Sequence, residues 1–476
     1  MPEVTSAPAP QRARAGPAAP EGEQSWMRRA LCLGLTALAF ALATPVAHAG
    51  LLPDPPPAAT PVGTVDLAGP GFASSNVEYI ATIPVDAPGV SARVVDVGAQ
   101  RRLYVSGVPG LSIYDITHPA LPLLLGHLPL PNWENEDIAV SADGSTVLVT
   151  EYTGTFYLHV LDTSNPALPR WTASLLLDSG GHTSECLDAG CDWVYGAEGQ
   201  IIDLHDKANP VVRPEQWTDL LGLPDGHAMT LDEAGVLTID TTPLAMVDAS
   251  DPLHPVLLAT APEGAQDEAG TAYQHNNLRP HADGYRSRSP RTSKPLGPGE
   301  LILGNGETNL TGTCNEGSGP FATWSARGFD RGGSLQVLDV YRPVNGSWTD
   351  GNPAVNGLGC SGHWFTWQDA ASGDGYLVAA GWYEHGTRFL HVDRGTGAIE
   401  EIGFWQPVVG AASGAYLVGD GYVYVVDYER GIDILRFDET APRPSTAEIE
   451  ASWLARAGDV DPLASAERLF CSIGQQ

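Results

Sequence analysis

The chain has 476 residues, of which 57 are acidic and 25 basic, so its formal net charge is −32. A surface of this charge repels nucleic acids and anionic lipids, which argues against either as a partner. The 54 glycines and 39 prolines are spread along the chain, a composition that is typical of many short strands and tight turns and that argues against long helices.

The first 49 residues have the pattern of an export signal. After a polar stretch, Met27 precedes two arginines and an apolar run over Ala30–Ala43, and small residues fit cleavage after Ala49. We expect a secretory signal peptide over 1–49, with Met27 as an alternative start of translation. The apolar run is too short for a membrane span, and no later stretch approaches roughly 18 apolar residues. A secreted or periplasmic protein without a membrane span is therefore expected.

A repeat of about 45 residues begins at Val77, after a Pro-rich linker over 50–75. Each unit contains four short apolar segments, and the third segment ends in an aspartate. These aspartates are Asp115, Asp162, Asp203, Asp248, Asp339, Asp393 and Asp438. Each carboxylate is placed to accept a hydrogen bond from the backbone N–H two residues on, in an Asx-turn. Four short strands per repeat of this length predict an all-β propeller.

Seven such aspartates predict a seven-bladed β-propeller over residues 76–438. The 91 residues between Asp248 and Asp339 are twice the usual spacing. We interpret this gap as one blade with two insertions, near Arg286–Gly299 and Leu310–Arg331. An eighth, degenerate blade is the alternative.

The two ends of the repeat region complement each other. The seventh unit stops without its fourth strand, while Glu78–Pro84 resembles the fourth strands of other units. We expect this N-terminal strand to complete the last blade, so that no sheet edge is left exposed. We expect residues 439–476 to form a C-terminal extension that is partly helical, because a capping-box pattern at Ser445 predicts a helix over about Ala447–Ala457.

Six cysteines are present, and Cys32 leaves with the signal peptide. Disulfides are expected in an exported protein. Two bridges are predicted, Cys186 with Cys191 and Cys314 with Cys360, which leaves Cys471 over. A zinc site is the alternative, although no C-x-x-C pair occurs.

In this arrangement the repeats resemble the LVIVD-repeat family of exported bacterial β-propeller proteins. The similarity is carried by the segments Val423–Asp438 and Gly381–Asp393, and by the D-x-x-x-P turns after Asp115 and Asp162. The resemblance covers about Val77–Asp438. It implies a propeller and export, and it supplies no catalytic residues.

A histidine recurs at the start of the first strand of successive units. These residues are His182, His227, His275 and His363, and Glu136 takes the same position in an earlier unit. Because the first strands of a propeller line its central channel, we expect the five side chains to converge at the channel mouth. Imidazoles and carboxylates suit a divalent transition-metal ion or calcium. The alternative is that each histidine only hydrogen-bonds to the neighbouring blade.

The loops between the second and third strands are expected to border the same mouth. They carry acidic and aromatic side chains that suit the binding of a ligand. The candidates for this binding rim are Glu151, Tyr152, Trp382, Tyr383, Glu384, His385, Asp427, Tyr428 and Arg430, with further carboxylates at Glu198, Asp240 and Glu307.

Two functions follow from these patterns. The first is a non-catalytic binding or scaffold protein, a monomer that recognises an extracellular protein, glycan or small ligand through its rim. It is favoured because no complete catalytic set is recognised and no G-x-S-x-G motif occurs. The alternative is a metal-dependent hydrolase or lyase that uses the His/Glu cluster.

Overall fold

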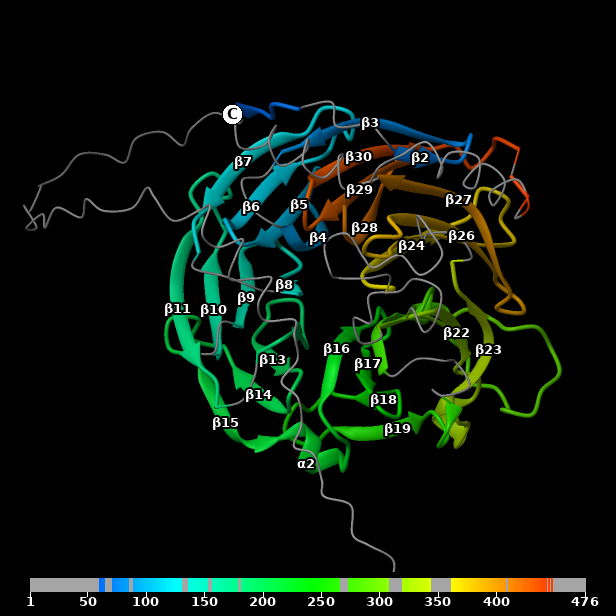
Figure 1. Cartoon of the computed structure of the whole chain (residues 1–476). Coiled ribbons are helices and arrows are strands. Elements are labelled where there is room, and N and C mark those ends of the chain that lie inside the picture. Colours follow the sequence, from blue (N-terminus) through cyan, green and yellow to red (C-terminus); the bar gives the residue numbers. More distant parts are fainter. Residues whose placement is uncertain are drawn as a thin grey trace, which may run out of the picture. The chain divides into compact units, whose positions relative to one another are not determined.

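The repeats form seven antiparallel sheets that follow one another around a ring, as Figure 1 shows. The computed structural model describes residues 60–64, 71–84, 89–130, 136–152, 156–178, 181–265, 273–307, 319–343, 361–407, 410–442, 444–445 and 447. The prediction of a seven-bladed β-propeller is confirmed. No helix in these ranges is long and apolar enough to cross a membrane.

Each blade has four main strands, and in blades 1 to 6 they run in chain order from the innermost to the outermost. Blade 1 comprises β4 (Gly89–Val97), β5 (Gln100–Gly107), β6 (Gly110–Asp115) and β7 (Leu123–Leu128). Blade 2 comprises β8 (Ile138–Val140), β9 (Thr146–Tyr152), β10 (Phe156–Asp162) and β11 (Arg170–Leu176). Blade 3 comprises β12 (Ser184–Cys186), β13 (Trp193–Gly196), β14 (Gln200–Asp203) and β15 (Val211–Gln216). Blades 4 and 5 comprise β16 (Gly226–Leu231), β17 (Val236–Thr241), β18 (Ala245–Asp248) and β19 (Val256–Thr260), and β20 (Tyr273–Leu278), β21 (Leu301–Glu307), β22 (Phe321–Ser325) and β23 (Gln336–Tyr341).

The last two blades also contain strands from the N-terminal end. Blade 6 comprises β24 (Phe365–Asp369), β25 (Gly375–Gly381), β26 (Thr387–Asp393) and β27 (Ile399–Pro407), and blade 7 comprises β28 (Ala412–Gly419), β29 (Tyr422–Asp427), β30 (Gly431–Phe437) and β3 (Val77–Ile83). Two shorter strands, β1 (Thr60–Pro61) and β2 (Gly71–Ala73), pair with the outer strands of blades 1 and 6. The described helices are short: α2 (Trp217–Leu221), η1 (Ala282–Gly284) and η2 (Phe329–Arg331).

The hydrophobic core lies between neighbouring sheets. Every residue of β25 is buried, which requires a blade against both faces of its sheet. Phe389 of blade 6 stacks on Phe437 of blade 7 with ring centroids 4.4 Å apart, a contact worth about 1 kcal/mol beyond its buried area. The innermost strand β28 contacts β4, so the last blade packs directly against the first.

The aspartates that end the third strands make the Asx-turns that the repeat predicts. Asp115 accepts a hydrogen bond from the N–H of Thr117 at 2.9 Å, and Asp438 accepts one from the N–H of Thr440 at 2.9 Å. The same i to i+2 bond occurs in four other blades, at Asp162, Asp203, Asp248 and Asp393. The repeated aspartate is therefore a turn residue in six of the seven blades.

Blade 5 departs from the prediction at Asp339. This aspartate lies within the outermost strand β23, whereas the third strand is β22, inside the segment predicted as an insertion. The residues of β22 are all buried, and the strand has no closing aspartate. The repeat pattern therefore placed the third strand one apolar segment too late, although the prediction of one blade in this region is correct.

The N-terminal strand completes the last blade as expected. Strand β3 pairs antiparallel with β30 from Val77 opposite Phe437 to Ile83 opposite Ile432. This pairing joins the start of the propeller to its end and covers the edge of β30. Two strands, β1 and β2, also fall within the segment predicted as a linker.

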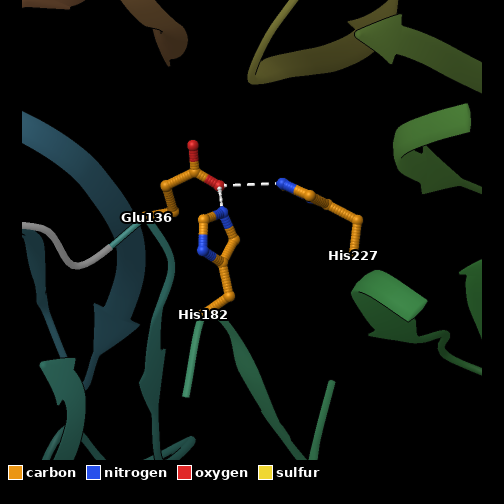
Figure 2. Close-up of side chains that lie close together, drawn as sticks. All are labelled: Glu136, His182 and His227. Carbon is orange, nitrogen blue, oxygen red and sulfur yellow. Dashed lines mark ion pairs between the residues drawn. The ribbon is translucent and has the colours of Figure 1, made fainter. Parts of the chain in front are cut away.

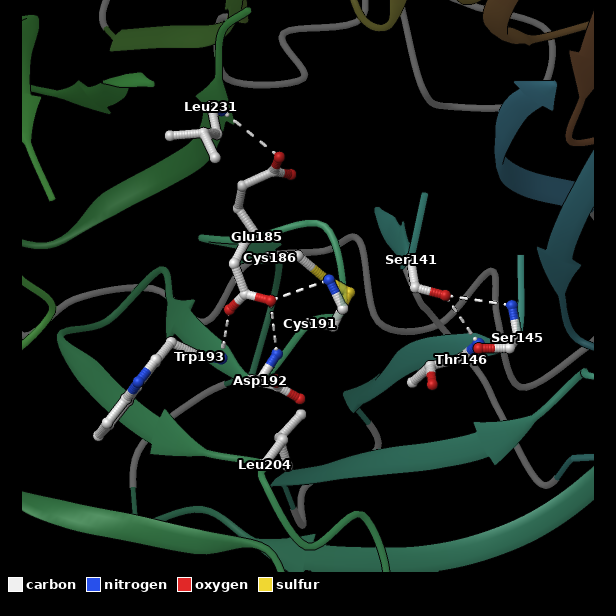
Figure 3. Close-up of a disulfide and its surroundings, with 12 residues drawn as sticks. Ser141, Ser145, Thr146, Glu185, Cys186, Cys191, Asp192, Trp193, Leu204 and Leu231 are labelled. Carbon is white, nitrogen blue, oxygen red and sulfur yellow. Dashed lines mark hydrogen bonds between the residues drawn. A yellow bond between two sulfur atoms is a disulfide. The ribbon is translucent and has the colours of Figure 1, made fainter. Parts of the chain in front are cut away.

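The predicted bridge between Cys186 and Cys191 is confirmed and closes the turn between β12 and β13 (Figure 3). Asp188 holds the same turn, because its carboxylate accepts the N–H groups of Gly190, Asp192 and Trp193 at 2.8–3.0 Å. The predicted bridge between Cys314 and Cys360, the leftover Cys471 and most of the C-terminal extension lie outside the described residues.

Removal of this disulfide should have a modest effect. The two cysteines are separated by 5 positions, so the loop that they close is short and its contribution to the free energy of unfolding is about 2 kcal/mol. We expect the Cys186→Ala/Cys191→Ala variant to lose this amount of stability, measured by urea denaturation. Addition of Asp188→Ala to that variant tests how much the hydrogen bonds of the turn contribute. A loss several times larger in the double cysteine variant would contradict this account.

Candidate metal centre

Five successive blades each place one polar side chain at the start of the innermost strand. Glu136 and His182 lie two residues before β8 and β12, His227 and His275 lie within the first three residues of β16 and β20, and His363 lies two residues before β24. Because the blades repeat around the channel, the same position in each blade faces the same end of it. The structure brings together all five residues that the sequence pattern singles out.

Glu136 is the centre of this cluster. Its Oε2 atom lies 2.5 Å from Nε2 of His182 and 2.9 Å from Nε2 of His227, as Figure 2 shows. Its other oxygen, Oε1, lies 3.1 Å from Nε2 of His363. The Glu136 side chain is only 5% exposed, so one buried carboxylate contacts imidazoles from three different blades.

The four imidazoles form a continuous row. Ring centroids are separated by 4.7 Å between His182 and His227, by 4.3 Å between His227 and His275, and by 4.0 Å between His275 and His363. Three groups of three donor atoms occur in the cluster, and the atoms within each group lie within 4.8 Å of one another. They are Glu136 with His182 and His227, Glu136 with His275 and His363, and His227 with His275 and Glu307.

Backbone contacts between blades hold these residues in place. Hydroxyl Oγ1 of Thr150 donates to the carbonyl of His182 at 2.9 Å, and Nδ2 of Asn305 donates to the carbonyl of His363 at 2.7 Å. The carbonyl of His227 accepts a bond from the Thr183 hydroxyl. Since each of these donors comes from a different position of the ring, the repeat geometry fixes the row of histidines.

Two of the histidines have a defined tautomer. Nδ1 of His227 contacts the backbone carbonyl of His275 at 3.3 Å, and Nδ1 of His363 contacts the carbonyl of Ser413 at 2.7 Å. A carbonyl can only accept, so Nδ1 carries the hydrogen in both rings. Nε2 of each ring faces Glu136. When such a ring is neutral, Nε2 carries the lone pair; when the ring is protonated, the Nε2–H group donates to the carboxylate. The sequence offered hydrogen bonds to a neighbouring blade as the alternative to metal ligation. These bonds are present, and they also turn Nε2 of both rings toward Glu136, the orientation that ligation of an ion would need.

His275 lacks a hydrogen-bond partner for either ring nitrogen among the described residues, although its side chain is 0% exposed. Nε2 of His275 lies 3.8 Å from Oε2 of Glu136, which is too far for a hydrogen bond. Burial, reinforced by His363 and His227, lowers the pKa of His275 well below its ordinary value. This imidazole is therefore neutral, with its polar atoms unsatisfied inside the cluster.

The charge balance of the cluster depends on Glu136. Burial alone would raise the pKa of Glu136, but the neighbouring His182 and His227 outweigh this effect and hold it well below the ordinary value. Burial likewise opposes a charge on His363, but the hydrogen bond to Glu136 and the charges of Glu136 and Glu307 together outweigh burial and raise the pKa of His363. The carboxylate is therefore ionised, and it favours a positive charge at its surrounding nitrogens.

Glu307 is a sixth residue of the cluster that the predicted metal ligands did not include. It ends β21 and lies with His227 and His275 in one of the three donor groups. The hydroxyl of Tyr383 donates to Oε1 of Glu307 at 2.7 Å, and the Tyr383 ring lies 4.7 Å from that of His363. The sequence signal for Glu307 was its position at the end of the second strand, where blades 2 and 4 carry Glu151 and Asp240.

A pocket of about 460 Å³ reaches the cluster between blades 3 and 4. His182 and His227 form part of its lining, and their side chains are 24% and 11% exposed, whereas those of His275 and His363 are 0% exposed. Glu198 and Asp240 also line it. Burial raises the pKa of Glu198 to about 7 and that of Asp240 well above its ordinary value. A small ligand would therefore approach the cluster from this side.

Most of the predicted rim residues lie in the interior. Trp382, Tyr383, Glu384, His385, Asp427 and Arg430 are buried, Glu151 is 9% exposed, and Tyr428 is half-buried. The backbone of Tyr152 ends β9, and its side chain lies outside the described part. Their polar groups have internal partners: Nε1 of Trp382 donates to the carbonyl of Gly319 at 3.1 Å, and Glu151 pairs with His159 at 3.0 Å. Loop position alone therefore did not predict exposure.

Asp427 should make stability depend on pH. Burial, with help from Asp433, raises the pKa of Asp427 to about 6. Because the folded-state value lies above the ordinary value of 3.8, the contribution of Asp427 to stability is present below about pH 4 and is lost as the pH rises to about 6, by about 3 kcal/mol at most. Asp427→Asn, which keeps an oxygen for the N–H groups of Glu429 and Arg430, should remove this slope in urea titrations from pH 4 to 7. An unchanged slope would contradict the buried-acid account.

Comparisons with known proteins extend to the fold alone. No family model and no curated protein matches the chain. Among solved structures, the chain is similar to the β-propeller domain of Cps50 (Swd1) from Myceliophteria thermophila, at 14% identity and a TM-score of 0.48, over 74% of this chain and 98% of that one. It is also similar to a protein from Lactobacillus plantarum, at 11% identity and a TM-score of 0.46, over 67% of this chain and 84% of that one. A third similar structure is a putative 6-phosphogluconolactonase from Bacteroides uniformis, at 13% identity and a TM-score of 0.45, over 71% of this chain and 92% of that one.

Proposed function

We propose that this protein is a binding propeller that holds one divalent transition-metal ion in the His/Glu cluster at one end of its channel. The observation that carries the proposal is His275. Its imidazole is fully buried and neutral. Neither ring nitrogen has a hydrogen-bond partner among the described residues, and the ring belongs to the row of four imidazoles described above. An ion bound at Nε2 would satisfy this atom.

The distances in the cluster suit a single ion. Two nitrogen ligands that are each about 2.1 Å from one metal ion lie at most about 4.2 Å apart. Within each of the three groups the donor atoms lie within 4.8 Å of one another, so movements of a few tenths of an ångström would let the donors of one group share an ion. His227 and His275 belong to more than one group, which favours one shared ion over several separate ones.

The donor types favour a transition metal over calcium or magnesium. Calcium and magnesium prefer oxygen ligands, whereas four of the six donor residues here are histidines. Imidazole suits zinc, copper, iron and nickel. Two carboxylates, from Glu136 and Glu307, would neutralise the charge of a divalent ion inside a buried site.

Elemental analysis tests the proposal directly. We expect the purified chain, incubated with a divalent transition metal and then desalted, to retain about one ion per chain. The His182→Ala/His227→Ala variant should retain less than about a tenth of that amount, since it removes the two ligands that border the pocket. His159→Ala is the matched control, because His159 also pairs with a buried glutamate, Glu151, outside the cluster.

Two results would refute the metal centre. One is a wild-type chain that retains no metal after incubation with zinc, copper, iron and nickel ions in turn. The other is an equal loss of metal in His159→Ala, which would show that retention does not depend on the cluster.

A metal-dependent hydrolase or lyase is the second candidate function, favoured by the pocket beside His182 and His227. A divalent ion exposed there would polarise a ligand oxygen or lower the pKa of a bound water. Glu198, with a pKa raised by burial to about 7, lines the same pocket and would exchange protons near neutral pH. Catalysis would be supported if the metal-loaded chain turns over chromogenic esters and if Glu198→Gln abolishes this turnover while the metal is retained. Metal binding without turnover would leave the non-catalytic function.

Export and membership of the LVIVD-repeat family remain part of the proposal. They are supported by the leader pattern over 1–49 and by the D-x-x-x-P turns in blades 1 and 2. Mass spectrometry of protein recovered outside the cytoplasm should give an N-terminus at Gly50. Recovery of the whole chain from the cytoplasm alone would contradict export.

A further inference from the structure

The segment between the first two strands of blade 5 reverses the charge of the rest of the chain. Residues 285–299 contain four basic side chains, Arg286, Arg288, Arg291 and Lys294, and no acidic one, in a chain with a net charge of −32. Lys294 is also one of only two lysines. A concentration of cations in a chain otherwise rich in acids requires a reason of its own.

This segment is fixed to the propeller from within. Arg288 and Arg327 both pair with the buried carboxylate of Glu300. Nη1 and Nη2 of Arg327 donate to the carbonyls of Thr292 and Lys294, each at 2.7 Å. The network therefore defines the path of the loop without using the charges of Arg291 or Lys294, neither of which has an ion pair among the described residues.

A pocket of about 560 Å³ lies between this segment and the outer parts of blades 5 and 6. The backbone N–H of Leu296 donates to the carbonyl of Gly395 in blade 6 at 2.9 Å, which fixes the loop beside the pocket. Among the described residues that line it are three cations and no carboxylate. Hydroxyl and amide groups complete the polar lining, at Ser293, Ser325, Ser334, Gln336 and Thr396.

We infer that this pocket binds a small ligand that carries a phosphate or sulfate group. Arg291 and Lys294 are exposed and supply the positive charge. The three serine hydroxyls of the lining supply further donors to oxyanion oxygens, whereas the hydroxyl of Thr396 donates to Asp393. No aromatic side chain is among the described lining residues, so the pocket offers no stacking surface for a base. Two nearby carboxylates are engaged within the fold: Asp393 accepts the N–H groups of Gly395 and Thr396, and Glu300 pairs with Arg288 and Arg327. Arg291 and Lys294 therefore remain the charges available to a ligand.

Calorimetric titration of the full chain, stripped of metal with a chelator so that the metal centre does not compete, tests this inference. The probes are inorganic phosphate, inorganic sulfate and glycerol phosphate, with acetate as a planar monoanion at equal ionic strength. We expect one binding site per chain for at least one tetrahedral anion and much weaker binding of acetate. Binding of glycerol phosphate but not of inorganic phosphate would identify an ester as the ligand, and the reverse would identify the free ion.

Charge-reversal variants locate the site. Arg291→Glu and Lys294→Glu should each lower the association constant at least tenfold. Arg286→Glu is the matched control, because Arg286 belongs to the same segment and is exposed, but it donates to the carbonyls of Asp283 and Tyr285 and does not line the pocket. The inference is refuted if no tetrahedral anion binds, if acetate binds equally well, or if Arg286→Glu weakens binding as much as the other two variants.

Discussion

The Glu136→Gln variant is expected to lose most of its affinity for a transition-metal ion while keeping its fold. Glutamine has nearly the same shape as glutamate but lacks the charge that three imidazoles share through Oε1 and Oε2. Removal of a residue that only hydrogen-bonds to a metal ligand lowers metal affinity by about 10–100-fold. Loss of a central carboxylate ligand should therefore cost at least that much, measured by competition with a chromophoric chelator.

A matched control separates this effect from a general loss of a buried charge. Glu151→Gln removes the carboxylate that pairs with His159 at 3.0 Å in the neighbouring strands of blade 2, so it also breaks a buried glutamate–histidine pair. We expect its metal affinity to stay within about threefold of wild type, since neither residue belongs to the three donor groups. Equal affinity losses in both variants would show that Glu136 acts on stability and not as a ligand.

The pH dependence of Glu136→Gln gives a second readout. In the wild type the pKa of Glu136 lies well below its ordinary value, so its contribution to stability is present above pH 4.5 and is lost as the pH falls. In metal-free protein the glutamine variant should therefore lose less stability than wild type on acidification from about pH 5 to 3. A steeper loss in the variant would contradict the assigned charge of the cluster.

The cluster was accessible to sequence analysis because the repeat copies position as well as structure. Once the first strands were aligned, His182, His227, His275 and His363 fell at the same point, and a ring of blades brings such points together. The pairing of β3 with β30 was predictable for the same reason, since one unit lacked a strand and another region had one to spare.

Other features depended on contacts that a repeat does not encode. Asp339 fits the pattern of a closing aspartate but lies in β23, because the true third strand of blade 5 is entirely buried and carries no aspartate. Trp382 and Arg430 occupy loop positions yet are buried, since their polar atoms bond to Gly319 and Asp433. Such partners are distant in the chain or specific to one blade, so a single sequence does not reveal them.

Removal of strand β3 should unfold the propeller or leave it aggregated. The strand buries Val77 and Ile83 in two separate cores and pairs with β30 over its length. Burial of each of these two side chains contributes about 1.5–3 kcal/mol, and each of the several ladder hydrogen bonds contributes about 1 kcal/mol. The sum is a large part of the free energy of unfolding of a folded domain, which is roughly 5–15 kcal/mol. The experiment compares a chain that starts at Gly50 with one that starts at Gly89, the first residue of β4. Circular dichroism on heating measures the melting temperature of each chain, and size exclusion detects aggregation.

One further chain and the addition of a peptide show whether the effect belongs to β3. A chain that starts at Gly71 loses β1 but keeps β2 and β3, and it should melt within a few degrees of the longer chain. Addition of a synthetic peptide spanning Val77–Pro84 to the chain that starts at Gly89 should restore part of the lost stability, because the edge of β30 is then free to accept the same strand. A chain without β3 that melts like the longer one would show that ring closure rests on the contact between β28 and β4 instead.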